Sequence, residues 1–258
     1  MILKTLDFLI TYLAEERNEK IEIENLSEEE KKRLFRSLCN IREPKEISQE
    51  FLSIQDMYLQ KEIQKKGMVE DIEKSKITDN IYLWKGDITT LKIDAIVNAA
   101  NSQGLGCFIP CHKCIDNSIH SYSGIQLRLE CYEKMKEIKQ LETGEVFMTK
   151  GYNLPAKYII HTVGPIIYEE VTDKEREELR NCYIHSLQLA KENNIKEIAF
   201  PCISTGEFRF PKEEACQIAI KAVKEYLKEN ANWFEKIVFN VFTEGDYKIY
   251  QQNKFSIG

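Results

Sequence analysis

Residues 94–124 read DAIVNAANSQGLGCFIPCHKCIDNSIHSYSG, and the order of patterns in this stretch predicts the class of fold. Its first residues belong to the apolar run Ile93–Val97, which is typical of a buried strand. The chain then passes through two glycines and a proline before a helical pattern begins near Ser118. A strand that leads through a loop into a helix is the repeating unit of layered α/β domains. Ligands bind beyond the carboxyl ends of the strands in such domains, so we expect this loop to face a ligand.

The same alternation continues on both sides of this stretch. Further strand-like segments lie at 81–84, 147–148, 158–160, 198–200 and 237–242. Helical patterns fall between them, at 118–138, 174–193 and 212–228. Strands alternating with helices predict an α/β fold class with a largely parallel sheet.

The sequence before the first glycine, Gly67, differs in composition from the rest of the chain. It is rich in leucine, isoleucine, glutamate, lysine and arginine. The apolar spacing in 6–13 predicts one helix, Ser27–Glu30 has the form of a capping box that opens a second, and 49–65 predicts a third. We therefore divide the chain into a helical N-terminal extension, 1–75, and a main domain, 76–258. The extension has no cluster of polar residues that suggests chemistry, so we expect it to be a packing scaffold.

Composition narrows the class of protein. The 258 residues are 43% hydrophobic and 30% charged, which excludes extended disorder, and no apolar run is long enough to cross a bilayer. A net charge of −6 argues against a nucleic acid partner. The N-terminus lacks the pattern of a secretory leader, so we expect a cytoplasmic protein. Eight cysteines in a reducing compartment indicate metal binding or catalysis and not a disulfide framework.

Three of the eight cysteines lie in the loop of the opening stretch. Thiolates and imidazoles are the ligands that zinc prefers, and Cys107, His112 and Cys114 can surround one ion because the loop between them is not helical. Three protein ligands leave one zinc position open, which is the catalytic arrangement. Cys111 leaves two alternatives open: it closes a structural site with four ligands, or it forms a C-x-x-C redox pair with Cys114.

Further candidate residues lie in two other segments and at Asp116, near the end of the opening stretch. Residues 201–211 follow a strand and precede a helix, and their serine, threonine and glycine favour a phosphate-binding turn or only a turn. Asp87 follows another strand, where it can accept a hydrogen bond from an exocyclic amine or cap a turn. Asp116 can orient a water or cap the helix that we expect near Ser118. We interpret His161 as a buried structural imidazole.

Taken together, these segments resemble the macrodomain, an ADP-ribose-binding fold with three α/β/α layers and a mixed sheet. Five motifs occur in the family's order across about residues 80 to 245: Gly86–Thr89, Asp94–Asn101, Ile115–Gly124, His161–Pro165 and Ile203–Pro211. Ordinary members have a run of glycines where this chain has the cysteine-rich loop. That loop, together with a helical N-terminal extension, is similar to the zinc-dependent bacterial and fungal macrodomains, which are protein-ADP-ribose hydrolases.

The resemblance implies a role for each matching residue. Asp87 and the backbone of Ile88 would hold adenine, Phe242 would stack on it, and Asn101 would contact the distal ribose, the sugar joined to the protein. The second ligand loop would place backbone donors on the diphosphate and the ring of the last residue on the distal ribose; it consists of Ser204, Thr205, Gly206, Glu207 and Phe208. Cys107, His112 and Cys114 match the zinc ligands, and Cys111 falls at a variable position. Asp116 matches the catalytic acidic residue of the zinc-free hydrolases.

The expected activity is the zinc-assisted removal of mono-ADP-ribose from protein side chains, with Asp116 and Asn101 as the catalytic residues. Zinc would polarise a ribose hydroxyl or activate a water. The resemblance also implies a partner, a lipoylated glycine-cleavage H-like protein that a class M sirtuin ADP-ribosylates. Three alternatives remain: a reader that binds ADP-ribose without cleaving it, a deacetylase of O-acetyl-ADP-ribose, and a structural interaction protein.

Overall fold

A six-stranded mixed sheet forms the centre of the computed structural model, which describes residues 2–78, 80–230 and 232–253. The strands are β1 (Ile81–Lys85), β2 (Ala95–Ala100), β3 (Val146–Lys150), β4 (Tyr158–Val163), β5 (Glu197–Phe200) and β6 (Lys236–Val241). They lie in the order β1-β6-β5-β2-β4-β3. Every neighbouring pair is parallel except β3 and β4, so the prediction of a mixed, largely parallel sheet is confirmed.

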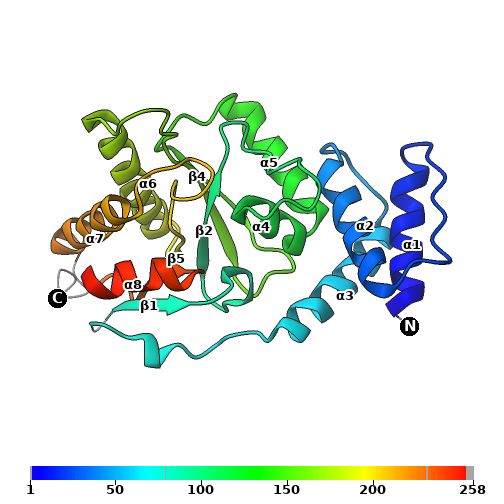
Figure 1. Ribbon diagram of the computed structural model, residues 1–258, viewed down its shortest axis with the longest axis horizontal. Helices are drawn as coiled ribbons and strands as arrows, with labels where there is room; N and C mark the ends of the chain where they lie inside the picture. The colour runs from blue at the N-terminus through cyan, green and yellow to red at the C-terminus, as the bar shows by residue number, and fades with distance from the viewer. Residues whose placement is uncertain (1, 79, 231, 254–258) are drawn as a thin grey trace.

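Helices cover both faces of the sheet, which gives the three layers that the resemblance implied (Figure 1). One face packs against α4 (Ile115–Ser123) and α5 (Ile125–Ile138), and the other against α6 (Asp173–Glu192), α7 (Lys212–Glu229) and α8 (Glu244–Asn253). The period-2 alternation of β2 produces this division, because Ile96 joins the core under α4 and α5, whereas Ala95 and Val97 join the core on the other side.

The N-terminal extension forms three helices, α1 (Ile2–Glu15), α2 (Glu28–Ile41) and α3 (Gln49–Lys66), and they lie beyond α4 and α5 (Figure 1). The predicted capping box is present: the Ser27 side chain accepts from the Glu30 amide, and the Glu30 carboxylate accepts from the Ser27 amide. The three helices share an apolar core of their own, which also includes Ile125 of α5. The extension is therefore packed onto the main domain.

The structure departs from the sequence expectations in two helices. The single helix expected at 118–138 is two, because Gly124 adopts φ 104° and separates α4 from α5. Helix α8 was not predicted, since Gly245 and Asp246 at its start have the character of a turn. Two short 3-10 helices, η1 (Glu73–Ser75) and η2 (Ile88–Thr90), flank β1. Among the described residues, no helix combines the length and apolar character needed to cross a membrane.

Candidate functional site

A cleft of about 580 Å³ opens at the carboxyl ends of the parallel strands. This volume is in the range of pockets that hold small organic ligands. Its walls come from the segments that follow β1, β2, β4, β5 and β6, since parallel strands direct their carboxyl ends to the same edge. The residues that the resemblance assigned to ADP-ribose, zinc and catalysis all line it: Asp87, Ile88, Asn101, Cys107, His112, Cys114, Asp116, Ser204, Thr205, Gly206, Glu207, Phe208 and Phe242.

At one end of the cleft, Asp87 caps η2 and accepts hydrogen bonds from the Thr89 amide at 3.0 Å and the Thr89 hydroxyl at 2.6 Å. The ammonium of Lys66, at the end of α3, lies 2.6 Å from its other carboxylate oxygen. Burial alone would raise the pKa of Asp87, but the Lys66 and Thr89 donors outweigh it and hold the pKa below its usual value. The carboxylate is thus fixed and ionised, and it retains lone pairs for a further donor.

At the other end, the loop after β2 brings three metal-ligand side chains together. One ligand atom each of Cys107, His112 and Cys114 lies within 4.8 Å of the others, and Cys107 Sγ is 3.7 Å from His112 Nδ1. Zinc bonds of about 2.3 Å to sulfur and about 2.0 Å to nitrogen place tetrahedral ligands about 3.5 Å apart. The donor set therefore fits a zinc ion in its chemistry, and the separation of the Cys107 and His112 ligand atoms is close to this spacing.

Two further contacts suit a metal site at this position. Cys114 is the N-cap of α4, where the Asn117 amide donates to its sulfur at 3.4 Å and the helix dipole favours a thiolate. Burial nevertheless raises the pKa of Cys114 to about 12. On the other side of the cluster, Glu207 Oε1 lies 3.8 Å from His112 Nε2. This separation is beyond hydrogen-bond distance, so Glu207 contributes a negative charge near the cluster and does not fix the ring.

Cys111 is directed elsewhere. Its sulfur donates to the backbone carbonyl of Arg33 in α2 at 3.3 Å, and it is not part of the group of ligand atoms formed by Cys107, His112 and Cys114. Within the part of the chain that the structure describes, the protein donors of the cluster are therefore Cys107, His112 and Cys114.

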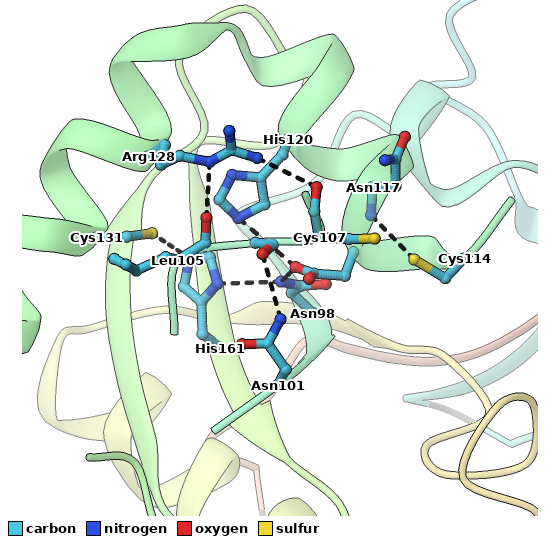
Figure 2. Close-up of polar contacts among 12 residues, drawn as sticks. Asn98, Asn101, Leu105, Cys107, Cys114, Asn117, His120, Arg128, Cys131 and His161 are labelled. Carbon is cyan, nitrogen blue, oxygen red and sulfur yellow. Dashed lines mark hydrogen bonds and ion pairs between the residues drawn. The ribbon is translucent and has the colours of Figure 1, made fainter. Parts of the chain in front are cut away.

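Asp116 lies in the cleft wall and belongs to a buried polar network with Asn98 and His161, both of which Figure 2 labels. Asn98 Nδ2 donates to Asp116 Oδ1 at 2.7 Å and also lies 3.1 Å from His161 Nδ1. His161 Nε2 is 2.9 Å from the Thr149 hydroxyl, so both ring nitrogens have partners and its interpretation as a buried structural imidazole holds. Asp116 does not cap a helix, because α4 begins at Ile115, one residue before it.

Burial sets the charge states in this network. It raises the pKa of Asp116 to about 6, although the Asn98 hydrogen bond and the Arg128 charge act in the opposite direction. It lowers the pKa of His161 to about 3, and His161 is therefore a neutral ring at neutral pH. Asp116 is thus a carboxyl group whose proton exchanges close to the physiological range, the property expected of a general acid or base.

The remaining predicted residues shape the walls between these two ends. Asn101 donates through Nδ2 to the Gly106 carbonyl at 3.2 Å and so holds the beginning of the cysteine-rich loop. Ser204 adopts φ 64° in the loop after β5, and a Cβ on Gly164 would lie 2.0 Å from its hydroxyl oxygen. Gly164 is therefore required for the close approach of the two strand ends. Phe242 is 73% exposed at the rim.

Several polar residues that build the site were not singled out from the sequence as functional. Lys66 forms an ion pair with Asp87, and Asn98 donates a hydrogen bond to Asp116. The side-chain Nδ2 of Asn240 donates to the Gly86 carbonyl at 3.0 Å. The available signal was a polar residue inside an apolar strand, which Asn98 and Asn240 both provide. Lys66 gave no such signal, because its partner is 21 positions away.

The layered fold and this cleft define an α/β/α domain that binds its ligand at the ends of parallel strands. The sequence pattern of the Macro domain matches residues 97–219. The chain is 48% identical to a protein-ADP-ribose hydrolase of Treponema medium over 252 residues, covering 95% of this chain and 96% of that protein. It is 45% identical to a protein-ADP-ribose hydrolase of Staphylococcus aureus strain MSSA476 over 260 residues, covering 96% and 94%. The chain belongs to the macrodomain family.

A solved structure agrees with this assignment. The crystal structure of a Trypanosoma brucei macrodomain in complex with ADP-ribose has a TM-score of 0.65 and 30% identity. It covers 86% of this chain, and the similarity extends over 95% of that chain.

Proposed function

We propose that this protein is a zinc-dependent hydrolase that removes mono-ADP-ribose from modified protein side chains. The observation that carries the proposal is the position of the Cys107, His112 and Cys114 donors in the wall of the same cleft that Asp87 and the loop after β5 line. The names of the Treponema and Staphylococcus relatives support hydrolysis, and the ADP-ribose complex of the Trypanosoma macrodomain supports the ligand. The chemistry of the donor set supports zinc.

The ligand would lie along the cleft with adenine at the Asp87 end. There the Asp87 carboxylate accepts from the exocyclic amine, the Ile88 backbone borders the base, and Phe242 stacks on it. Ser204, Thr205 and Gly206 surround the diphosphate, where backbone N–H groups of a strand-to-helix loop suit an anion. The distal ribose then reaches Asn101, Phe208 and the metal donors.

The reaction would break the bond between C1 of the distal ribose and an oxygen of the protein side chain. Water adds its hydroxyl to the ribose and its proton to the departing oxygen, so the products are ADP-ribose and the free side chain. Zinc, when bound, supplies a Lewis acid at this end of the cleft. Asp116 positions the attacking water or relays its proton, and Asn101 orients the distal ribose.

A test of this function compares three samples for the release of ADP-ribose from a mono-ADP-ribosylated protein: wild type, Cys114→Ala and zinc-stripped wild type. We expect release by the wild type alone and recovery of the stripped sample when zinc is returned. Equal rates in all three samples would refute the catalytic metal.

The same assay separates the alternatives. Calorimetric binding of ADP-ribose without turnover by any sample would identify a reader, and faster turnover of O-acetyl-ADP-ribose than of modified protein would identify a deacetylase. Neither binding nor turnover would leave a structural interaction protein.

The proposed protein substrate is a lipoylated glycine-cleavage H-like carrier that a class M sirtuin has ADP-ribosylated. We expect such a carrier to be cleaved faster than an unrelated modified protein at equal concentration. Equal cleavage of both would remove this assignment and leave the hydrolase activity standing.

A further inference from the structure

The loop that carries two of the three metal donors has little regular structure of its own. Between β2 and α4 it makes few backbone hydrogen bonds to itself, among them Gly104 to Asn101 at 2.9 Å and His112 to Ile109 at 3.2 Å. A ligand set loses affinity when its donors must be ordered at the moment of binding, so something outside the loop has to fix Cys107 and His112.

Helix α2 of the N-terminal extension makes direct contact with the loop at two consecutive residues. The Arg36 guanidinium donates to the His112 carbonyl at 2.9 Å and to Asn117 Oδ1 at 2.7 Å. One turn further along, Asn40 Oδ1 accepts from the Cys111 amide at 2.9 Å, and Asn40 is only 1% exposed. Arg36 and Asn40 are four positions apart, so both side chains leave the same face of α2.

Arg128 of α5 joins the same helix to the other donor of the loop. Its guanidinium donates to the carbonyls of Leu105 at 2.8 Å and Cys107 at 3.2 Å (Figure 2). It also donates to three carbonyls at and just beyond the end of α2, those of Cys39, Asn40 and Arg42, at 3.2, 2.7 and 2.7 Å. The side chain is buried, and the negative end of the helix dipole suits its charge.

We propose that α2 is a positioning element of the metal site, and that Arg36 and Asn40 set the place of His112 while Arg128 sets the place of Cys107. This inference rests on the proposed function, because it takes zinc as the ion. Cys114 needs no such support, since it is the N-cap of α4. The N-terminal extension is then part of the site and more than the packing scaffold that the sequence suggested.

The same hydrogen bonds would also hold the extension to the domain without any effect on a metal, and the experiment has to separate these roles. The test variants are Arg36→Met, which keeps the aliphatic stem and removes the donors, and Asn40→Leu, which removes the acceptor for the Cys111 amide. Arg36→Lys keeps the charge but lacks the planar guanidinium that donates to both acceptors. We expect its effect on zinc binding to lie between those of the wild type and Arg36→Met.

The matched control is Arg42→Met. Arg42 is a buried arginine just beyond the end of α2, whereas Arg36 is half-buried. The Arg42 side chain binds Glu16 and the carbonyls of Lys45 and Glu46, all within the extension. Its loss weakens the packing of the extension without removing a side-chain contact to the loop.

The measurements are the zinc dissociation constant, from competition with a chromophoric chelator, and the absorption spectrum of the cobalt-substituted protein. We expect Arg36→Met and Asn40→Leu to weaken zinc binding by about 10- to 100-fold, the usual effect of losing a group that orients a ligand. The cobalt spectrum should shift in both, whereas Arg42→Met should lower the unfolding temperature and leave zinc affinity and spectrum at the wild-type values.

Each outcome decides the matter. If the wild type binds zinc and the folded variants bind it equally well, or if Arg42→Met weakens binding as much as they do, the positioning role is overturned. If Arg36→Met fails to fold, wild-type affinity in Arg36→Lys overturns it. A wild type that binds no zinc overturns the proposed metal function, and this inference with it.

Discussion

Asp116 is a carboxyl group that the fold keeps away from water, with one hydrogen bond from Asn98 and an exposed fraction of 4%. Its folded pKa, about 6, lies above the value of a free aspartate. The folded state therefore binds its proton more tightly than the unfolded state, and at neutral pH the ionised group weakens the fold. A group retained at a cost to stability is characteristic of an active site.

Because the ionised Asp116 weakens the fold, we expect Asp116→Asn to lower activity without lowering stability. We expect turnover to fall by about 10²- to 10³-fold, the contribution of a positioned acid or base, while the affinity for ADP-ribose changes little. The unfolding temperature of the zinc-free variant at pH 7 should equal or exceed that of the zinc-free wild type, because a buried charge has been removed. Kinetics, calorimetry and thermal unfolding on the same preparations check all three. Turnover within threefold of the wild type would exclude Asp116 from catalysis.

At the scale of elements, Asp94 ties the beginnings of three strands together. It accepts from the Lys157 ammonium just before β4 at 2.7 Å, and from the amides of Lys196 and Glu197 at the start of β5 at 3.1 and 3.2 Å. Burial would raise the pKa of Asp94, but these donors outweigh it and lower the pKa. Its contribution to stability is therefore present above the unfolded pKa and is lost as pH falls through the folded pKa.

Asp94→Asn should lower the free energy of unfolding by about 1–2 kcal/mol at pH 7, because an amide cannot accept at both atoms. The difference from the wild type should shrink as pH falls below the unfolded pKa of about 3.9 and through the lowered folded pKa, because the wild-type carboxylate is then protonated as well. Urea unfolding at pH 7 and pH 3 measures the free energy of unfolding of both proteins. The control is Glu169→Gln, which removes a carboxylate at an exposed bend. A loss of stability that does not change with pH would show that the charge of Asp94 has no part in it.

A second connection between elements links α3 to the other end of the cleft. Lys66→Met should weaken ADP-ribose binding by about 3- to 10-fold, since Asp87 loses the ammonium that orients it, a charge-assisted contact of about 1 kcal/mol. The neighbouring Lys65 pairs with Glu62 and not with Asp87, so Lys65→Met is the matched control. Calorimetric titration with ADP-ribose and with AMP compares the two. An equal effect of both substitutions would mean that the contact with Asp87 is irrelevant to binding.

The elements themselves were largely predictable. Among the described residues, all six strands and the helices α1, α2, α3, α6 and α7 match predicted segments, and one further predicted helix spans both α4 and α5. The capping box Ser27–Glu30 marked the start of α2 correctly. The break at Gly124 was missed because its turn is fixed by distant contacts: the Ile125 amide donates to Gln55 of α3. Helix α8 was missed because the cap that starts it, the Asp246 amide donating to the Thr243 hydroxyl, is a local bond within a sequence typical of turns.

The site was predictable where its residues cluster in sequence, and not where they pair across it. Cys107, His112 and Cys114 lie within eight positions, so their spacing alone predicted that they bind one metal ion together. Arg36 reaches His112 and Asn117 from 76 and 81 positions away, and Arg128 reaches Asn40 from 88. Periodicity places these arginines on helices but contains no information on which loop each one meets.

At the scale of the whole molecule, a metal that binds only the folded state should stabilise it. Saturating zinc at about 100 times its dissociation constant contributes about 2.7 kcal/mol, or roughly 5–10 °C in the unfolding temperature of a chain of this size. We expect a chelator to lower the unfolding temperature of the wild type by that amount and to have no effect on Cys114→Ala.

Cys216→Ala is the control for this measurement, because it removes a buried thiol of α7 that lies in the apolar core on the far face of the sheet. It should unfold at a lower temperature and still respond to the chelator in full. A wild type whose unfolding temperature is the same with and without the chelator would contradict a zinc site in the folded protein.

The five carbonyls around Arg128 matter for any experiment on a fragment that contains only the main domain, 76–258. A fragment that starts at residue 76 keeps Arg128 but lacks three of those acceptors. The guanidinium, which is buried in the whole chain, would then be exposed to solvent or would bind other acceptors. Inhibitor screens run on such a fragment would then sample a distorted mouth of the cleft, and compounds found in them would bind poorly to the protein that retains its N-terminal helices.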